Sequence, residues 1–235
     1  MKKALSFITA FLAVSTSCGT AVAADTYVSA NVGMSSMNDI KAEWFVNKNE
    51  TNTISTDTGY ALSAAVGRDY GDYRFEWELG YSSQEATECV TDANISPLYP
   101  MNKGAREIDG DINVLSFMVN GYYDIDLGGI ELSPFVGVGY AKFEVDGCVP
   151  ESNTSGNALH TSVGTFAYQL GVAVSVPVSS RVKVDARYRY FATDDFQMYM
   201  PNADVPAGVS PLDHGSYFNW SGESHSAMVG LRVTI

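Results

Sequence analysis

Residues 182–191 read VKVDARYRYF and alternate apolar and charged side chains without a break. One parity carries Val182, Val184, Ala186, Tyr188 and Tyr190, and the other carries Lys183, Asp185, Arg187 and Arg189. Because successive side chains of a β-strand point to opposite faces, the stretch predicts a strand with one apolar and one charged face. The class of fold depends on which of these faces looks inward.

Seven further segments show the same alternation and predict strands at residues 27–35, 60–69, 73–82, 112–124, 132–143, 164–176 and 226–235. The parity of segment 132–143 stays open, because Val136 and Val138 alternate with Gly137 and Gly139. No internal repeat, low-complexity tract or linker separates the segments. The sequence therefore predicts a single all-β domain with eight strands.

The predicted connections alternate between long and short along the chain. The short ones are residues 70–72, 125–131 and 177–181, and the long ones are residues 36–59, 83–111, 144–163 and 192–225. An even number of strands, with short turns at one end and long loops at the other, is typical of an outer-membrane β-barrel. Both termini of such a barrel lie at the short-turn end.

The direction in which the charged face of each strand points distinguishes a membrane barrel from a water-soluble one. A soluble barrel of the lipocalin kind keeps its apolar face inside, whereas a membrane barrel turns that face toward lipid. Segments 73–82 and 182–191 are the third and seventh strands, which are diametrically opposed in a ring of eight, so their charges can pair across the interior. We expect a lumen charge network of Arg74, Glu76, Glu78, Lys183, Asp185, Arg187, Arg189 and Arg232.

Aromatic residues and loop charges favour the membrane barrel. The apolar parity places aromatic residues near both strand ends, as expected for two interfacial girdles: Tyr73, Phe75 and Tyr123 toward the short turns, and Tyr81, Phe166, Tyr168, Tyr188 and Tyr190 toward the long loops. Trp77, in mid-strand, does not follow this pattern. Residues 192–225 contain five acidic and no basic residues: Asp194, Asp195, Asp204, Asp213 and Glu223. These loops either attract divalent cations and basic partners or are simply solvated.

The N-terminus reads as an export signal. Lys2 and Lys3 precede the apolar run ALSFITAFLAV, and Ala21-Val22-Ala23 forms a small-residue cleavage site. We expect residues 1–23 to be a secretory signal peptide and residues 24–235 to be the barrel domain. Removing the two lysines changes the net charge from −13 to −15, which argues against nucleic-acid binding.

Two cysteines remain after the predicted cleavage, Cys89 and Cys148. An even pair in an oxidising compartment predicts a disulfide between two long loops, with two free thiols as the alternative. The sequence holds no recognisable cofactor or metal motif, so we expect neither a cofactor nor a metal site.

Residues 117–143, FMVNGYYDIDLGGIELSPFVGVGYAKF, resemble the opacity-type, or surface-antigen, family of small outer-membrane β-barrels with porin-like members. The shared features are Asn120, Tyr122, Tyr123 and Asp124 at a strand end, the Gly128-Gly129 turn, and residues 134–139, which read PFVGVG. The resemblance implies an eight-stranded antiparallel up-and-down transmembrane barrel in a Gram-negative outer membrane, surrounded by lipid and lipopolysaccharide. Members of the family usually end in an aromatic residue, and Ile235 departs from this.

These features predict a non-enzymatic surface protein whose barrel anchors four acidic extracellular loops for interaction or adhesion. The alternative is a narrow porin-like channel with a charged lumen. Two remoter alternatives are a soluble lipocalin-like binder and a lipid A-modifying enzyme. The enzyme reading rests on His160-Thr161-Ser162, whose His and Ser share one face of a strand, but no acidic residue lies between Ser162 and Asp185 to orient the histidine.

Overall fold

The computed structural model describes residues 24–44, 51–91, 104–146, 160–201 and 215–235. Within these ranges the chain forms thirteen β-strands: β1 (Asp25–Met37), β2 (Ile40–Trp44), β3 (Thr51–Thr56), β4 (Gly59–Asp69), β5 (Tyr73–Thr91), β6 (Gly104–Tyr123), β7 (Ile125–Asp126), β8 (Glu131–Asp146), β9 (His160–Pro177), β10 (Val182–Thr193), β11 (Phe196–Pro201), β12 (Gly215–Trp220) and β13 (Glu223–Thr234). No helix in the described ranges is long and apolar enough to cross a membrane.

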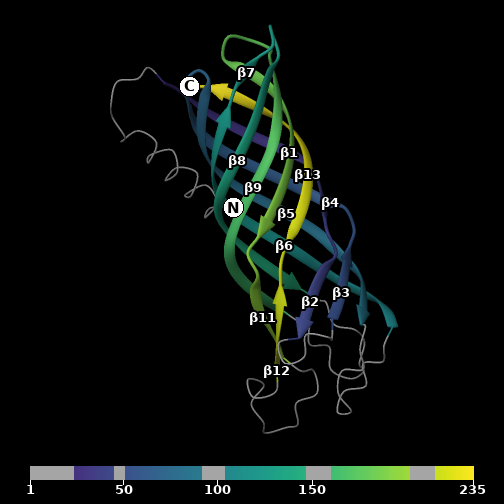
Figure 1. The fold of residues 1–235 in the computed structure, drawn as a ribbon. Helices are drawn as coiled ribbons and strands as arrows, with labels where there is room; N and C mark the ends of the chain where they lie inside the picture. Colours follow the sequence, from purple (N-terminus) through teal and green to yellow (C-terminus); the bar gives the residue numbers. More distant parts are fainter. Residues whose placement is uncertain (1–23, 45–50, 92–103, 147–159, 202–214) are drawn as a thin grey trace, which may run out of the picture.

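Eight of these strands close into a barrel (Figure 1). Their order around the ring is β4-β1-β13-β10-β9-β8-β6-β5, and β5 pairs back to β4. All neighbours are antiparallel, and the first and last strands, β1 and β13, pair with each other. The predicted all-β, eight-stranded, up-and-down barrel is confirmed.

The prediction of long loops was wrong in part, because much of these connections is strand. β5 and β6 extend their ladder from Ser83 to Thr91 and from Gly104 to Asp111. β2 and β3 form a hairpin within residues 36–59, and β11 and β12 form another within residues 192–225. The alternation of apolar side chains stops where these extensions begin. The extensions still pair, because hydrogen bonds between the backbones of adjacent strands do not depend on that alternation. Figure 1 shows β2, β3, β11 and β12 at the end of the barrel opposite to β7 and the C-terminus.

The charged parity faces inward. On β10, Asp185, Arg187 and Arg189 are buried, whereas Val184 and Tyr188 are exposed. On β8, Val136 and Val138 point outward. The sequence of segment 132–143 had left open which of its two faces points outward, because these valines alternate with glycines. The exterior is therefore an apolar surface, as expected for strands that face lipid.

Exposed aromatic residues lie at both ends of this apolar surface. Tyr73, Phe75 and Tyr123 are near the short turns, and Tyr60, Tyr140, Phe166, Tyr168 and Tyr188 are near the opposite end. The short turns use glycine where the backbone needs the left-handed region, with φ of +94° at Gly71, +82° at Gly128 and +110° at Gly129. The resulting tight turns give the barrel one compact end and one extended end.

Candidate functional site: the barrel interior

The centre of the lumen is an ion-pair layer between opposite walls of the barrel. Arg187 on β10 contacts Glu78 at 2.5 Å and Glu76 at 3.3 Å, and both carboxylates lie on β5. Arg189, two residues further along β10, contacts Glu78 at 3.3 Å. In the ring order β5 and β10 are four strands apart, so these contacts cross the full width of the barrel. All four side chains are almost completely buried.

Neutral side chains complete the hydrogen bonding of Glu76. The Tyr27 hydroxyl donates to Oε2 at 3.1 Å, the Asn120 amide donates to Oε1 at 3.2 Å, and the Tyr122 hydroxyl also donates to Oε1. With Arg187, this carboxylate has four donors from three other strands: one from β1, two from β6 and one from β10. A buried carboxylate with this many donors is a fixed structural element of the interior.

A second group of ion pairs lies at the short-turn end. Arg74 on β5 binds Asp124 through two nitrogens, at 2.9 and 3.1 Å, and its guanidinium lies 4.0 Å from the ring centroid of Tyr122. Glu131 on β8 accepts from Lys183 at 2.6 Å and also pairs with Arg232. The Arg74–Asp124 pair joins adjacent elements, whereas Glu131 reaches β10 and β13, which are two and three strands away in the ring. Together these contacts brace the short-turn end of the barrel.

The structure brings the eight predicted charges together in two groups rather than one. Glu76, Glu78, Arg187 and Arg189 meet across the lumen. Arg74 does not pair with β10, because Asp124 at the end of the adjacent β6 is closer in register. Lys183 is only partly buried and pairs with Glu131, and Asp185 lies 3.6 Å from Arg232. The expected pairing across the full length of both strands is therefore corrected at these positions.

Sequence reasoning missed six residues that complete these groups: Tyr27, Asn120, Tyr122, Asp124, Glu131 and Gln169. The alternation along the strands was an available signal for most of them. Tyr27, for example, lies on the same face of its strand as the polar residues Ser29 and Asn31, which indicates the interior. With the additions, the interior ion pairs join five cationic and five anionic side chains: Arg74, Lys183, Arg187, Arg189 and Arg232 with Glu76, Glu78, Asp124, Glu131 and Asp185. The described interior network is thus neutral overall.

The other half of the lumen, toward β2, β3, β11 and β12, is filled by apolar side chains. This apolar cluster comprises Met37, Ile40, Ile54, Ala86, Ile112, Val114, Met118, Ala141, Phe143, Val145, Ala167, Phe191, Phe196 and Trp220. The rings of Phe143 and Phe196 pack with centroids 5.1 Å apart. Side chains thus fill the interior with a charged layer toward the short turns and an apolar layer toward the extended end, as the bore of eight strands permits.

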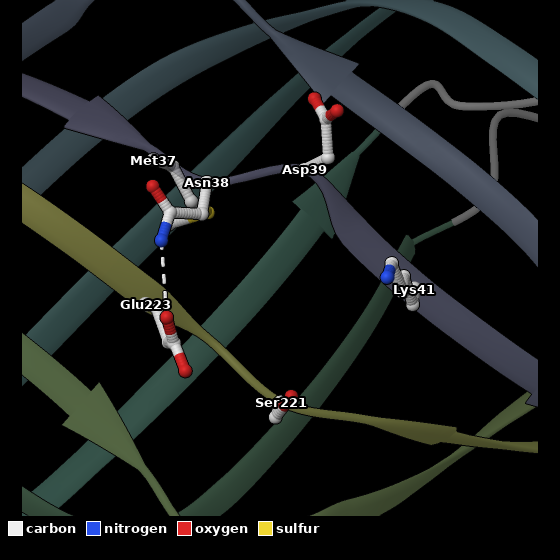
Figure 2. A pocket seen from close by; sticks show the side chains of 6 residues that line it. All are labelled: Met37, Asn38, Asp39, Lys41, Ser221 and Glu223. Atoms are coloured by element: carbon white, nitrogen blue, oxygen red, sulfur yellow. Dashed lines mark hydrogen bonds between the residues drawn. The ribbon is translucent and has the colours of Figure 1, made fainter.

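A polar pocket of about 630 Å³ lies at the rim, where β1 and β13 separate (Figure 2). β1 pairs with β13 as far as Met37 and Ser224, and the next ladder contact on this side joins Glu43 of β2 to Asn219 of β12. The lining residues are Met37, Asn38, Asp39, Lys41, Ser221 and Glu223. The Asn38 amide donates to Glu223 at 3.0 Å and fixes one edge of the pocket.

Several predicted features lie outside the described residues. Cys148 and the side chain of Cys89 are among them, so their disulfide stays a prediction. The same holds for the His160 side chain of the possible His-Thr-Ser motif, for Asp204 and Asp213, and for the signal peptide at residues 1–23. Within the described part of the chain, no three His, Cys, Asp or Glu side chains gather as a metal site would require.

Solved structures show the same fold. A major outer-membrane protein from Thermus thermophilus has a TM-score of 0.55 at 13% identity, covering 91% of this chain and 100% of that chain. The outer-membrane protease OmpT from Escherichia coli has a TM-score of 0.54 at 8% identity, covering 90% and 97%. OprG from Pseudomonas aeruginosa has a TM-score of 0.53 at 12% identity, covering 90% and 96%. At these identities the likeness shows the fold alone.

No curated protein matches the sequence. The family described as outer membrane protein beta-barrel domain matches residues 9–210, which is most of the chain. In this chain the charged faces of the strands point inward, eight strands close into a ring and side chains fill the interior, all of which agree with that match. The chain belongs to the family of outer-membrane β-barrel domain proteins.

Proposed function

We propose that the protein is a non-enzymatic surface anchor, a closed barrel that holds its long connections outside the cell for interaction or adhesion. The observation that carries this proposal is the filled interior. A neutral network of buried ion pairs occupies the short-turn half, and the apolar cluster occupies the other half. Two successive layers of packed side chains leave the barrel as a rigid support rather than a conduit.

The proposed orientation follows from the two unlike ends of the barrel. The short turns and both termini face the periplasm, and the extended end with β2, β3, β11 and β12 faces outward. The connections at the extended end carry an excess of acidic residues, five against none over residues 192–225. A negative potential there favours basic partners or divalent cations.

Single-channel recording in a planar bilayer tests the closed state. We expect no conductance steps from the refolded wild-type protein, with heat-modifiable mobility on gels as the check that folded barrels are present. Reproducible steps would favour a narrow channel instead. In that case Arg187→Met should change the ion selectivity, because it removes one positive charge from the narrow layer between Glu76 and Glu78.

Epitope tags test the orientation independently of conductance. A tag inserted within residues 202–214 should be reached by antibody on intact cells. A tag inserted between Gly128 and Gly129 should be reached only after the outer membrane is permeabilised. The opposite pattern would overturn the orientation while leaving the closed barrel intact.

A further inference from the structure

The hairpin formed by β7 and the start of β8 has an aliphatic outer face. Ile125 pairs with Leu132, and at the next matching position the Leu127 N–H donates to the carbonyl of Ile130 at 2.8 Å. Because side chains alternate along a strand, these four residues project from one face of the hairpin. Leu127 is 62% exposed and Ile130 is 47% exposed. We call these four residues the aliphatic foot.

The acidic residues of the hairpin are held away from that face. Oδ1 of Asp126 accepts from the backbone N–H groups of Gly128 at 2.8 Å and Gly129 at 3.4 Å, and the positive φ angles of these glycines close the tight turn. Glu131 points into the barrel, where it accepts from Lys183 at 2.6 Å. The aliphatic foot therefore presents neither a charge nor a polar side chain.

The aliphatic foot continues the lipid-facing wall of the barrel. Leu132 pairs with Val174, which is the first of three exposed valines at residues 174–178. Leu127 follows Tyr123 of the aromatic belt by four positions, roughly 13 Å along a strand at about 3.3 Å per residue. In Figure 1 the teal β7 hairpin extends beyond the C-terminus at this end of the barrel. The apolar exterior thus passes the aromatic belt on this side.

The turn between β4 and β5, at the same end of the barrel, is built differently. Asp69 and Asp72 flank its glycine, and Oδ1 of Asp69 accepts from the Gly71 N–H at 2.9 Å. Its large apolar residue, Tyr70, packs edge to face on Phe75, with ring centroids 6.3 Å apart. This turn therefore ends in charged and polar groups, and the apolar exterior stops at the aromatic belt beside it.

We propose that the aliphatic foot is embedded in the periplasmic phospholipid leaflet, so that the β7 hairpin is an additional membrane anchor of the barrel. Its continuity with the lipid-facing wall identifies lipid as its occupant, and removal of its side chains from water is favourable. The barrel tilts toward this side, because tilting accommodates a longer apolar wall. The tip glycines stay at the membrane surface, so a polar tag inserted between them still reaches the periplasm.

Photolabelling of the wild-type sequence tests this contact without any substitution. The protein without its predicted signal peptide is refolded into phosphatidylcholine vesicles that contain a membrane-soluble carbene precursor. Tandem mass spectrometry then assigns the label to residues. We expect label on residues 125–132 and none on residues 69–72. Equal labelling of the two turns, or no label on either, would overturn the proposal.

A tryptophan placed in the aliphatic foot measures its depth. Trp44, Trp77 and Trp220 are replaced by Phe, and Leu127→Trp then supplies the only tryptophan. We expect acyl chains brominated near the headgroup to quench its fluorescence more than chains brominated near the methyl end, and aqueous iodide to quench it little. The matched control is Asp72→Trp in the same background, which iodide should quench and brominated chains should not.

Two results of this experiment would contradict the proposal. Quenching of Leu127→Trp by iodide alone would place the aliphatic foot in water. Protection from both iodide and brominated chains would mean that protein, such as a second copy of the barrel, covers it. The variant that keeps Trp77 alone is the positive control, since this outward side chain lies in mid-strand. Gel mobility shift on heating verifies that each variant is folded.

The anchoring role has its own variant. Leu127→Ser combined with Ile130→Ser should lower carbene labelling of residues 174–178, because this side of the barrel then rises toward the membrane surface. Unchanged labelling there would refute the anchoring role. Only the identity of the leaflet rests on the proposed orientation, since these measurements report lipid contact whichever way the barrel faces. Conductance steps would contradict the closed barrel without changing the quenching at Leu127.

Discussion

Arg187→Met tests the central charge layer most directly. The substitution keeps an unbranched apolar stem but removes the guanidinium that contacts Glu78 at 2.5 Å and Glu76 at 3.3 Å. Neither carboxylate side chain has any exposed surface from which water could compensate. The network then holds one more negative than positive charge in the interior.

The expected cost follows from the contacts that remain. Removing one partner of a buried ion pair destabilises a protein by about 3–5 kcal/mol. Here Glu78 keeps Arg189 and Gln169, both at 3.3 Å, and Glu76 keeps its hydroxyl and amide donors. We therefore expect the lower end of that range, about 3 kcal/mol, which shifts a urea midpoint by about 1.5 M when the m-value is about 2 kcal/mol/M.

Reversible urea unfolding in lipid vesicles, followed by tryptophan fluorescence, measures this shift. Lys142→Met is the control, because its pair with Glu144 is exposed and should contribute less than about 1 kcal/mol. Adding Glu78→Gln to Arg187→Met should recover part of the loss, since it removes one of the carboxylates left unpaired. A midpoint for Arg187→Met equal to wild type, or no recovery in the double variant, would refute the assignment of these residues to one buried network.

Three further outcomes check other parts of the fold. Asp124→Asn should lower the free energy of unfolding by about 3 kcal/mol, because it leaves a buried guanidinium without its carboxylate, and urea titration measures the change. Gly137→Ala should destabilise by about 1–3 kcal/mol, since its Cβ would lie 2.0 Å from Oδ1 of Asn120, whereas the Cβ of Gly121→Ala meets nothing closer than 3.5 Å and should be tolerated. A variant with Trp77 as its sole tryptophan should be quenched by brominated acyl chains, because that side chain faces outward in mid-strand; unquenched fluorescence would contradict the inverted parity.

Local periodicity was enough to predict the walls of the barrel. The alternation in residues 182–191 defines two faces, and the short and long connections distinguish a membrane barrel from a soluble one. Alternation along each strand and the position of that strand in the ring together predicted that Glu76, Glu78 and Arg187 share the interior. The extensions of β5 and β6 were not predicted, since their polar sequences carry no apolar alternation and their ladder depends on the adjacent strand.

Where the alternation is unbroken, as in residues 182–191, the sequence by itself determined which side chains face the lumen, because every second side chain of a strand turns to the same face whatever the neighbouring strands do. Only the tertiary structure decided which of these side chains meet. The stagger of eight strands sets the height of each residue in the ring, so Arg187 reaches Glu76 and Glu78, while Arg74 is left with Asp124. The apolar cluster arises in the same way, from residues distant in sequence that ring closure brings to one level.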